Sequence, residues 1–391
     1  MKILFSHYGI IYKGGFNRTF NLARGIAALG HEVVFYTCQN GWEKFPFKEE
    51  TINNVKVFSF PDFLPYKLVS KGFGLLSIFL KIYKLRKLKI DIAHSDSGHR
   101  PSAGLPCYYA KRKNNALYVS EWWDYFGKGG QLKTKPFLFR LLLGWFESRS
   151  EIKNKRKADA IIVLSELMRK RALEFGIVPQ KIYKLHGGAN IINLKNDKRY
   201  IFERNNYKLL LGYIGLSEGD IDDIIELLKI FRDPLFSSEV LFITYGFKFS
   251  DSQLDNFFPY KNIFEFGWID FFKESEKLLI PDVYILIKEN NLVNCSGWPN
   301  RFGDYLACGK PIIANLYGEL IEFNSKYPNS IIQVDNNEEK IKLKILEILN
   351  GNFDLEKIGM NNLNIAKTDY SWDKKSQDLF AIYQDLLQNK K

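Results

Sequence analysis

Residues 299–319, PNRFGDYLACGKPIIANLYGE, constrain the fold of this chain more than any other stretch. Pro299 suits the first turn of a helix, where its missing N–H costs nothing, and apolar residues recur at helical spacing over residues 302–306. Gly309 ends the helix where a left-handed residue is favoured, and residues 311–315 read as a short buried strand. This order predicts one helix–strand unit of an α/β fold.

The N-terminus of this predicted helix has the character of a ligand site. Asn300 and Arg301 present free amides and a cation there, which suits a phosphate. Asp304, one turn later, can accept hydrogen bonds from hydroxyl groups. An ordinary βα unit with a capped helix is the alternative interpretation.

The chain contains two successive series of strands and helices. The apolar strand at residues 2–7 leads through Gly14-Gly15 into a helical pattern, and residues 31–37 form the next strand. The two glycines let the backbone approach a ligand at the start of that helix. A polar stretch at residues 193–208 predicts an interdomain linker before the second series.

At 391 residues the chain is long enough for two domains of ordinary size. We predict an α/β protein with two Rossmann-like domains that face each other across a cleft. The first domain is expected to comprise residues 1–188 and a C-terminal helix at 371–391, and the second residues 189–370.

Cysteine usage and hydropathy favour a cytoplasmic location. The four cysteines form no CxxC pair and have no histidine cluster nearby, which predicts reduced thiols. They are Cys38, Cys107, Cys295 and Cys308. We expect neither a signal peptide nor a membrane-spanning helix, because the chain opens on a short strand and has no run of eighteen apolar residues.

The charge is unevenly distributed along the chain. Residues 1–200 carry 35 Lys and Arg against 15 Asp and Glu, whereas residues 201–391 carry 21 against 29. A polyanionic surface or substrate for the first half and a merely solvated basic face are both consistent with this. Nucleic acid is disfavoured, because the basic runs alternate with aliphatic residues instead of stacking aromatics.

Residues 65–90 carry the strongest basic run. Apolar side chains from residue 75 to 83 are followed by lysines and an arginine with no acidic residue between them. A basic amphipathic helix is typical of a membrane-surface element, although a core-facing helix with a solvated lysine face is the more common structure. Together with the apolar segment at 136–149, it predicts peripheral contact with a membrane.

Residues 116–130 predict a strand that ends in a polar, aromatic loop. Glu121 and Asp124 stand beside tryptophans at the end of that strand, where open α/β sheets place their ligands. Aromatic faces pack on sugars and carboxylates bind their hydroxyls, so the loop suits a sugar. A loop with buried tryptophans is the alternative.

Residues 298–314 resemble the donor-sugar loop of retaining glycosyltransferases of the GT-B fold, the large family-four group, and follow its variant WPN(K/R)xxDYLAxGxPxxA throughout. The glycine pair with GHEV after it resembles the first unit of that family. Residues 165–166 and 188–190 resemble the unit that closes its first domain, except that Asn190 stands where aspartate is usual.

The resemblance implies roles for individual residues. Arg301 would steady the donor diphosphate, Asp304 would hold the nucleotide ribose, and residues 267–269 would lie near the base. With Glu121 and Asp124 orienting the acceptor or the sugar, the candidate catalytic residues are Glu121, Asp124 and Arg301. The candidate donor-binding residues are Gly14, Gly15, Gly215, Gly267, Trp268, Lys288, Asn300, Arg301 and Asp304. No cofactor and no metal are expected, in agreement with the lack of a DxD sequence in a sugar-donor loop.

Two further positions depart from the family pattern. Relatives carry an arginine and a lysine for the donor pyrophosphate in a loop that here, at residues 215–220, has no cation. Ser296 stands where the first of two family glutamates is usual. Either the phosphates rest on backbone amides and Arg301, or donor binding is altered.

The predicted function is transfer of a sugar, with retained configuration, from a nucleotide-sugar to a glycan or lipid-linked acceptor, in cell-surface polysaccharide or lipopolysaccharide assembly. A non-catalytic protein that binds sugars or nucleotides, and a nucleotide-sugar epimerase on the same fold, are the alternatives.

Overall fold

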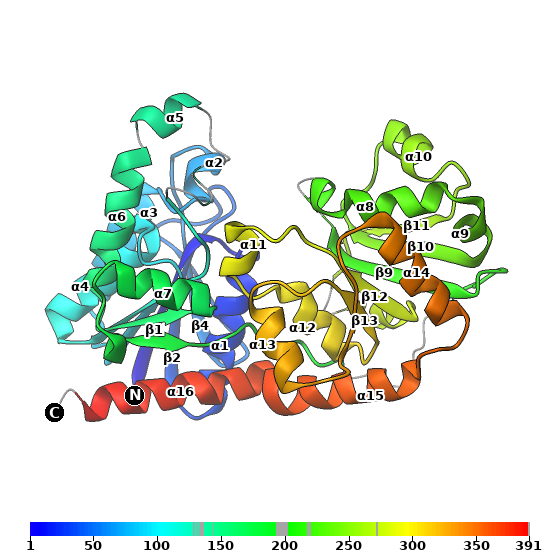
Figure 1. Ribbon diagram of the computed structural model, residues 1–391. Coiled ribbons are helices and arrows are strands. Elements are labelled where there is room, and N and C mark those ends of the chain that lie inside the picture. The colour runs from blue at the N-terminus through cyan, green and yellow to red at the C-terminus, as the bar shows by residue number, and fades with distance from the viewer. Residues whose placement is uncertain are drawn as a thin grey trace. The chain divides into compact units, whose positions relative to one another are not determined.

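The computed structural model describes residues 1–127, 130, 132, 137–142, 144–192, 202–216, 220–270 and 273–389 (Figure 1). The chain divides into two compact units, each with its own sheet. The first consists of residues 1–187, 295–298 and 372–391, and the second of residues 188–294 and 299–371. The predicted linker lies in part outside the described residues.

The first unit contains an eight-stranded sheet in the order β3-β4-β2-β1-β5-β6-β7-β8. Its strands are β1 (Lys2–Ile10), β2 (Glu32–Cys38), β3 (Lys48–Ile52), β4 (Val55–Phe60), β5 (Ile92–Ser95), β6 (Leu117–Trp122), β7 (Ala160–Val163) and β8 (Ile182–Lys184). All neighbours are parallel except β3, which pairs antiparallel with β4.

Helices cover both faces of this sheet (Figure 1). They are α1 (Phe16–Ala28), α2 (Tyr66–Val69), α3 (Leu75–Leu85), α4 (Pro101–Asn114), α5 (Phe137–Leu142), α6 (Gly144–Arg156), α7 (Glu166–Glu174) and α16 (Trp372–Gln388). Because successive strand residues point to opposite faces, Ile3 and Phe5 pack with α1 and α16, whereas Leu4 packs in a separate core with α3 and α4.

The second unit contains a six-stranded, entirely parallel sheet in the order β11-β10-β9-β12-β13-β14. Its strands are β9 (Leu209–Leu216), β10 (Val240–Gly246), β11 (Ile263–Gly267), β12 (Val283–Leu286), β13 (Ile312–Ala314) and β14 (Ile331–Gln333). Its helices are α8 (Ile225–Lys229), α9 (Pro234–Glu239), α10 (Asp251–Phe257), α12 (Asn300–Ala307), α13 (Glu319–Lys326), α14 (Glu338–Leu349) and α15 (Leu355–Ile365), with α11 (Leu292–Ser296) where the chain passes between the units. The predicted α/β fold with two Rossmann-like sheets is confirmed.

The segment 299–319 forms the predicted helix and strand, here α12 and β13. Pro299 is the N-cap of α12 and not its first helical residue, so the helix begins one residue later than expected. Gly309 has a positive φ of 64°, the left-handed backbone that ends a helix and that glycine adopts without strain.

The basic segment at 65–90 forms two short helices, α2 and α3. Lys81 lies neither on a membrane-facing surface, as predicted, nor on a solvated face, the alternative. It is fully buried, and its ammonium donates to the hydroxyl of Ser102 at 2.7 Å and to the carbonyls of Ser102 and His7. Leu75, Phe79 and Tyr83 are exposed instead. None of the helices that the structure describes has the length and apolar character needed to cross a bilayer.

Candidate functional site

The second unit contains two cations that are ion-paired with two carboxylates. The guanidinium of Arg301, on α12, donates to the Asp220 carboxylate and to the Gly215 carbonyl, each at 3.1 Å. The ammonium of Lys288 donates to the Asp223 carboxylate at 2.7 Å and also to Asp220. The four charged side chains are only 8–21% exposed. The protein therefore holds both cations in fixed positions.

β9 and β12 place this charged group at the carboxyl end of the sheet. Gly215 lies near the end of β9 with a positive φ of 69°, and Lys288 follows the end of β12 by two residues. The two strands are neighbours, and the chain order reverses between them, with β10 and β11 on one side and β13 and β14 on the other. Open α/β sheets bind ligands at such a switch point.

Neighbouring side chains fix both cations further. Arg301 donates to the Tyr213 hydroxyl, and its guanidinium lies 5.1 Å from the centre of that ring. Asn315 donates to the Lys288 carbonyl at 2.7 Å and accepts from its backbone N–H at 3.0 Å. Burial alone would lower the pKa of Arg301 and of Lys288, but Tyr213 and Asp220 more than offset it and raise both pKa values. Both side chains are therefore cationic at neutral pH.

Asp304 lies one turn beyond Arg301 on α12. Burial raises the pKa of Asp304 from 3.8 to about 7, while Arg301 and a hydrogen bond with the side chain of Asn190 act in the opposite direction. The turn that carries Asn190 packs closely on α12, because a Cβ at Gly303 would lie 3.0 Å from the Gly188 carbonyl. Asn190, which stands where the family that the chain resembles usually has aspartate, thus contacts Asp304, the residue predicted to bind the ribose.

Replacing Asp304 with Asn should change how stability depends on pH. Because the folded-state pKa is raised, the contribution of Asp304 is fully present below about pH 4 and is lost as the pH rises through about 7. A shift of one pKa unit corresponds to about 1.4 kcal/mol. Between pH 4 and pH 8 we therefore expect the unfolding free energy of the wild type, measured by urea denaturation, to fall by a few kcal/mol more than that of D304N. The exposed Asp255→Asn variant should follow the wild type, and parallel curves for D304N would refute the assignment.

The other predicted donor residues are not brought together. Gly267 ends β11 with a positive φ of 68°, and Trp268 after it is 82% exposed. β11 is an edge strand, and β10 separates it from β9. Asn300 opens α12 and is exposed. The structure groups Gly215, Lys288, Arg301 and Asp304, and places Gly267 and Trp268 at the edge of the sheet.

In the first unit, Glu121 is buried and engaged by other side chains. It is 1% exposed, and its two oxygens accept from the Arg18 guanidinium at 2.9 and 3.2 Å, while His94 Nε2 lies 3.4 Å from it. Burial alone would raise the pKa of Glu121, but Arg18 and His94 lower it to about 2. The carboxylate is therefore ionised and already satisfied within the protein, which is the environment of a positioning residue.

Glu121 positions the aromatic ring of Trp123. The indole N–H donates to the Glu121 carboxylate, and the ring lies on Gly15, where an added Cβ would come within 1.9 Å of it. Gly14, with a positive φ of 57°, lies next to the Tyr8 hydroxyl. The predicted glycine turn and the predicted sugar loop are thus in contact in the folded unit.

Asp124 lines a cavity, unlike Glu121. The cavity has a volume of about 250 Å³ and lies where β1, β5 and β6 end, at the switch point of the first sheet between β1 and β5. Its lining residues are Tyr8, Ser70, Lys71, Ser97, Arg100, Trp123, Asp124 and Phe126. Of the two predicted carboxylates, Asp124 is the one placed to meet a ligand.

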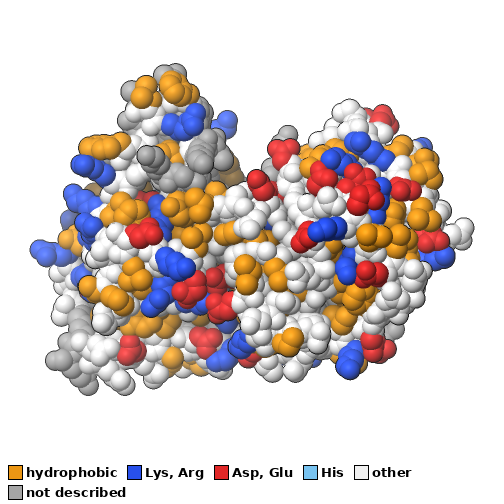
Figure 2. Space-filling view, in the orientation of Figure 1, with side chains coloured by type: hydrophobic (Ala, Val, Ile, Leu, Met, Phe, Trp, Pro, Cys, Tyr) orange, Lys and Arg blue, Asp and Glu red, His pale blue; other side chains and the backbone are white. Residues whose placement is uncertain are grey.

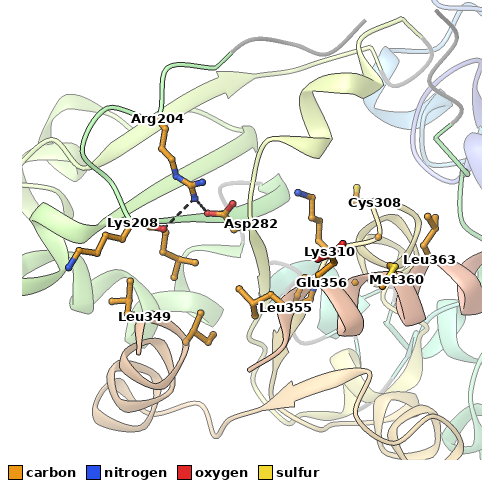
Figure 3. A pocket seen from close by; sticks show the side chains of 15 residues that line it. Arg204, Lys208, Asp282, Cys308, Lys310, Leu349, Leu355, Glu356, Met360 and Leu363 are labelled. Atoms are coloured by element: carbon orange, nitrogen blue, oxygen red, sulfur yellow. Dashed lines mark hydrogen bonds and ion pairs between the residues drawn. The ribbon is translucent and has the colours of Figure 1, made fainter. Parts of the chain in front are cut away.

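A larger pocket of about 540 Å³ lies at the opposite edge of the second sheet (Figure 3). Lys208, Asp282 and Pro311, which line it, precede β9, β12 and β13, so it lies at the amino ends of these strands. Arg204 pairs with Asp282 there. None of the predicted site residues lines this pocket.

Sequence reasoning missed the partners that hold the site. No role was assigned from the sequence to Asp220, Asp223, Tyr213 or Asn315. For the two aspartates, a signal was present in the sequence: both closely follow the glycine turn at the end of a predicted strand, where ligand sites of α/β sheets lie. Ser296, at the position where the family that the chain resembles usually has a glutamate, is buried in the first unit, where it accepts from the Tyr125 N–H and the Ser165 hydroxyl. Among the described residues, no three potential ligands from His, Cys, Asp and Glu cluster as a metal site.

Comparison with known proteins is consistent with this geometry. Residues 12–191 match the model of glycosyltransferase family 4. The chain is 23% identical to an uncharacterised glycosyltransferase of Methanocaldococcus jannaschii over 86% of each chain. It is 24% identical to the alpha-monoglucosyldiacylglycerol synthase of Acholeplasma laidlawii over 94% of this chain and 92% of that protein. Anabaena HepE in complex with UDP-glucose superimposes with a TM-score of 0.67 at 14% identity, over 98% of this chain and 100% of that one.

Proposed function

We propose that the chain is a member of glycosyltransferase family 4, whose model matches residues 12–191, and that it transfers a sugar from a UDP-sugar to a lipid acceptor at a membrane surface. The match to this family favours a nucleotide-sugar donor. The UDP-glucose complex of HepE favours uridine as the base, and the diacylglycerol synthase of Acholeplasma favours a lipid as the acceptor.

Arg301 and Lys288 are the groups we assign to the donor diphosphate. In the reaction, the bond from the anomeric carbon to the diphosphate oxygen breaks and a bond to the acceptor hydroxyl forms on the same face, while the hydroxyl proton leaves with the diphosphate. Fixed cations stabilise the negative charge that develops on the leaving group. Because Arg301 and Lys288 supply this charge, we propose that transfer needs neither a metal nor a cofactor and persists in EDTA.

The observation that carries the lipid acceptor is the outward apolar face of α3. Leu75, Phe79 and Tyr83 are 61%, 62% and 50% exposed and recur at helical spacing, so they form one stripe. The opposite side of α3 packs Leu80, Lys81 and Leu85 into the unit. An apolar stripe turned to solvent, next to the basic residues 84–89, matches an element that inserts between lipid headgroups.

A second apolar group lies on α5 and α6. Phe137, Leu141 and Trp145 are about two-thirds exposed, and the guanidinium of Arg149 lies 4.3 Å from the centre of the Trp145 ring. Figure 2 shows hydrophobic side chains beside Lys and Arg side chains over α5. Exposed aromatic and cationic side chains in one group favour a bilayer interface. Other residues of the predicted segment 136–149 lie outside the described side chains.

All four cysteines are free thiols, which agrees with a reducing compartment and a cytoplasmic membrane face.

The proposal is tested by a transfer assay. Purified protein is incubated with UDP-sugars labelled in the sugar and with vesicles of diacylglycerol or total membrane lipid, and label in the organic phase is measured with and without EDTA. We expect label in a lipid product from a UDP-sugar, with the anomeric configuration of the donor by NMR. Donor binding without transfer to any lipid or glycan would favour the non-catalytic alternative.

Replacing both Leu75 and Phe79 with Ser should weaken membrane binding. Each side chain contributes roughly 1.5–3 kcal/mol when fully buried, so we expect the partition coefficient onto phosphatidylcholine–phosphatidylglycerol vesicles to fall at least tenfold in a flotation assay. Leu343→Ser, which removes an equally exposed apolar side chain from the second unit, is the matched control. Equal loss in both variants would contradict the assignment of α3.

A further inference from the structure

The cavity beside Asp124 has the features of an anion site. Lys71 and Arg100 line it together with the single carboxylate of Asp124, so the lining carries a net positive charge. Ser70, Ser97 and Tyr8, which each carry a hydroxyl, also line the cavity. Cations with hydroxyl donors around a small cavity are the groups that bind a phosphate.

The fold brings the backbone segments that carry the two cations together. Gly72 follows Lys71 with a positive φ of 83°, and a Cβ there would lie 2.9 Å from the Cβ of Arg100. The Gly72 carbonyl also accepts from the Ser102 N–H at 3.0 Å, at the start of α4. Arg100 is the N-cap of α4, whose N-terminal end adds positive potential.

The ring of Phe126 and that of Phe73 orient Arg100, because their centres lie 5.2 and 5.4 Å from its guanidinium. Lys71 is exposed and forms no ion pair with any residue in the described part of the chain. Its ammonium is therefore available to a ligand, whereas Arg100 provides a fixed guanidinium.

The cavity also adjoins the apolar surface of the unit. Ser70 and Lys71 lie between α2 and α3, and the flanking side chains of Tyr66, Leu68 and Phe73 are exposed. A ligand held by Lys71 could thus extend an acyl chain along exposed apolar side chains. This continuity favours the headgroup of a lipid over a free anion.

We propose that the cavity binds the phosphate of a phosphate-bearing lipid acceptor through Lys71 and Arg100. This inference rests on the proposed function, because it names the acceptor class of the same site. It differs from what the similarity to a diacylglycerol synthase alone would predict, since diacylglycerol is neutral.

The test is direct binding without donor, by isothermal titration with dihexanoyl phosphatidic acid below its micellar concentration. We expect the wild type to bind it at least tenfold more tightly than dihexanoylglycerol or inorganic phosphate, and Lys71→Met to lose at least tenfold in affinity. Lys71→Arg should restore most of the affinity. Lys67→Met, an equally exposed lysine on α2 that does not line the cavity, is the matched control.

Equal affinity for the neutral and the phosphate-bearing lipid, or equal losses in Lys71→Met and Lys67→Met, would overturn the inference. Tighter binding of inorganic phosphate than of the lipid would do the same. This binding measurement does not depend on sugar transfer. Selective binding without transfer to any lipid would contradict only the proposed function. Transfer to diacylglycerol that is unchanged in Lys71→Met would contradict only this inference.

Discussion

Replacing Arg301 with Met is expected to reduce kcat/KM for the nucleotide-sugar by roughly 10²–10³-fold, the loss found when one fixed donor to a developing negative charge is removed. Arg301 lies at the switch point of the second sheet and is held there by Asp220, Gly215 and Tyr213. Steady-state kinetics with a labelled UDP-sugar measures the change. Most of it should appear in kcat, because charge on the diphosphate is greatest as the bond breaks.

Arg301→Met should lower the unfolding free energy less than the loss of one partner of an isolated buried ion pair would. Asp220 is 8% exposed but is still paired with Lys288 in the variant, so we expect a loss of about 1–3 kcal/mol in unfolding free energy. Arg301→Lys, which keeps the charge but not the planar fork, should recover part of the activity.

Lys310→Met is the matched control for Arg301→Met. Lys310 belongs to the same unit and carries the same charge, but it lines the pocket at the amino edge of the sheet (Figure 3). Its replacement should change kcat/KM less than twofold. If Lys310→Met and Arg301→Met lose activity equally, the charged group at β9 and β12 is not the diphosphate site.

Local sequence signals predicted the backbone around this site but not its charge partners. Pro299, Gly309 and the apolar spacing of α12 each act within a few residues, so the helix and β13 could be predicted. The pairing of Arg301 with Asp220 joins residues 81 positions apart. Such a pair depends on the order of strands in the sheet, which periodicity does not encode.

The outcome at α3 has a similar origin. The sequence pattern placed the lysines of this segment on an outward face, toward a membrane or toward solvent. Lys81 is buried instead, because three oxygen acceptors of Ser102 and His7 meet its ammonium. Burial of a charge is tolerated only where such partners exist, and these come from α4 and β1. Propensity and spacing carry no record of them, so the exposed stripe of Leu75, Phe79 and Tyr83 emerged only from the structure.

Replacing Glu121 with Ala is expected to destabilise the first unit by roughly 3–5 kcal/mol, the cost of removing one partner of a buried ion pair. Arg18, which is 5% exposed, would keep as acceptors, among the described residues, only the carbonyls of Leu185 and His186. Urea denaturation at pH 7 measures the loss. Because the folded-state pKa of Glu121 is lowered to about 2, the stabilisation it provides is fully present above about pH 4.5 and declines as the pH falls toward 2.

A double-mutant cycle with Arg18→Met separates the ion pair from packing. If Glu121 acts by holding Arg18 and Trp123, the double variant should be less destabilised than the sum of the single ones, with a coupling of about 2–3 kcal/mol. Glu166→Gln, which changes an exposed carboxylate of the same unit, should be nearly neutral. Glu121→Gln, which keeps the shape, should retain part of the stability and lose the dependence on pH below 4.5. A Glu121→Ala variant that is inactive but as stable as the wild type would instead identify Glu121 as a group that contacts the substrate.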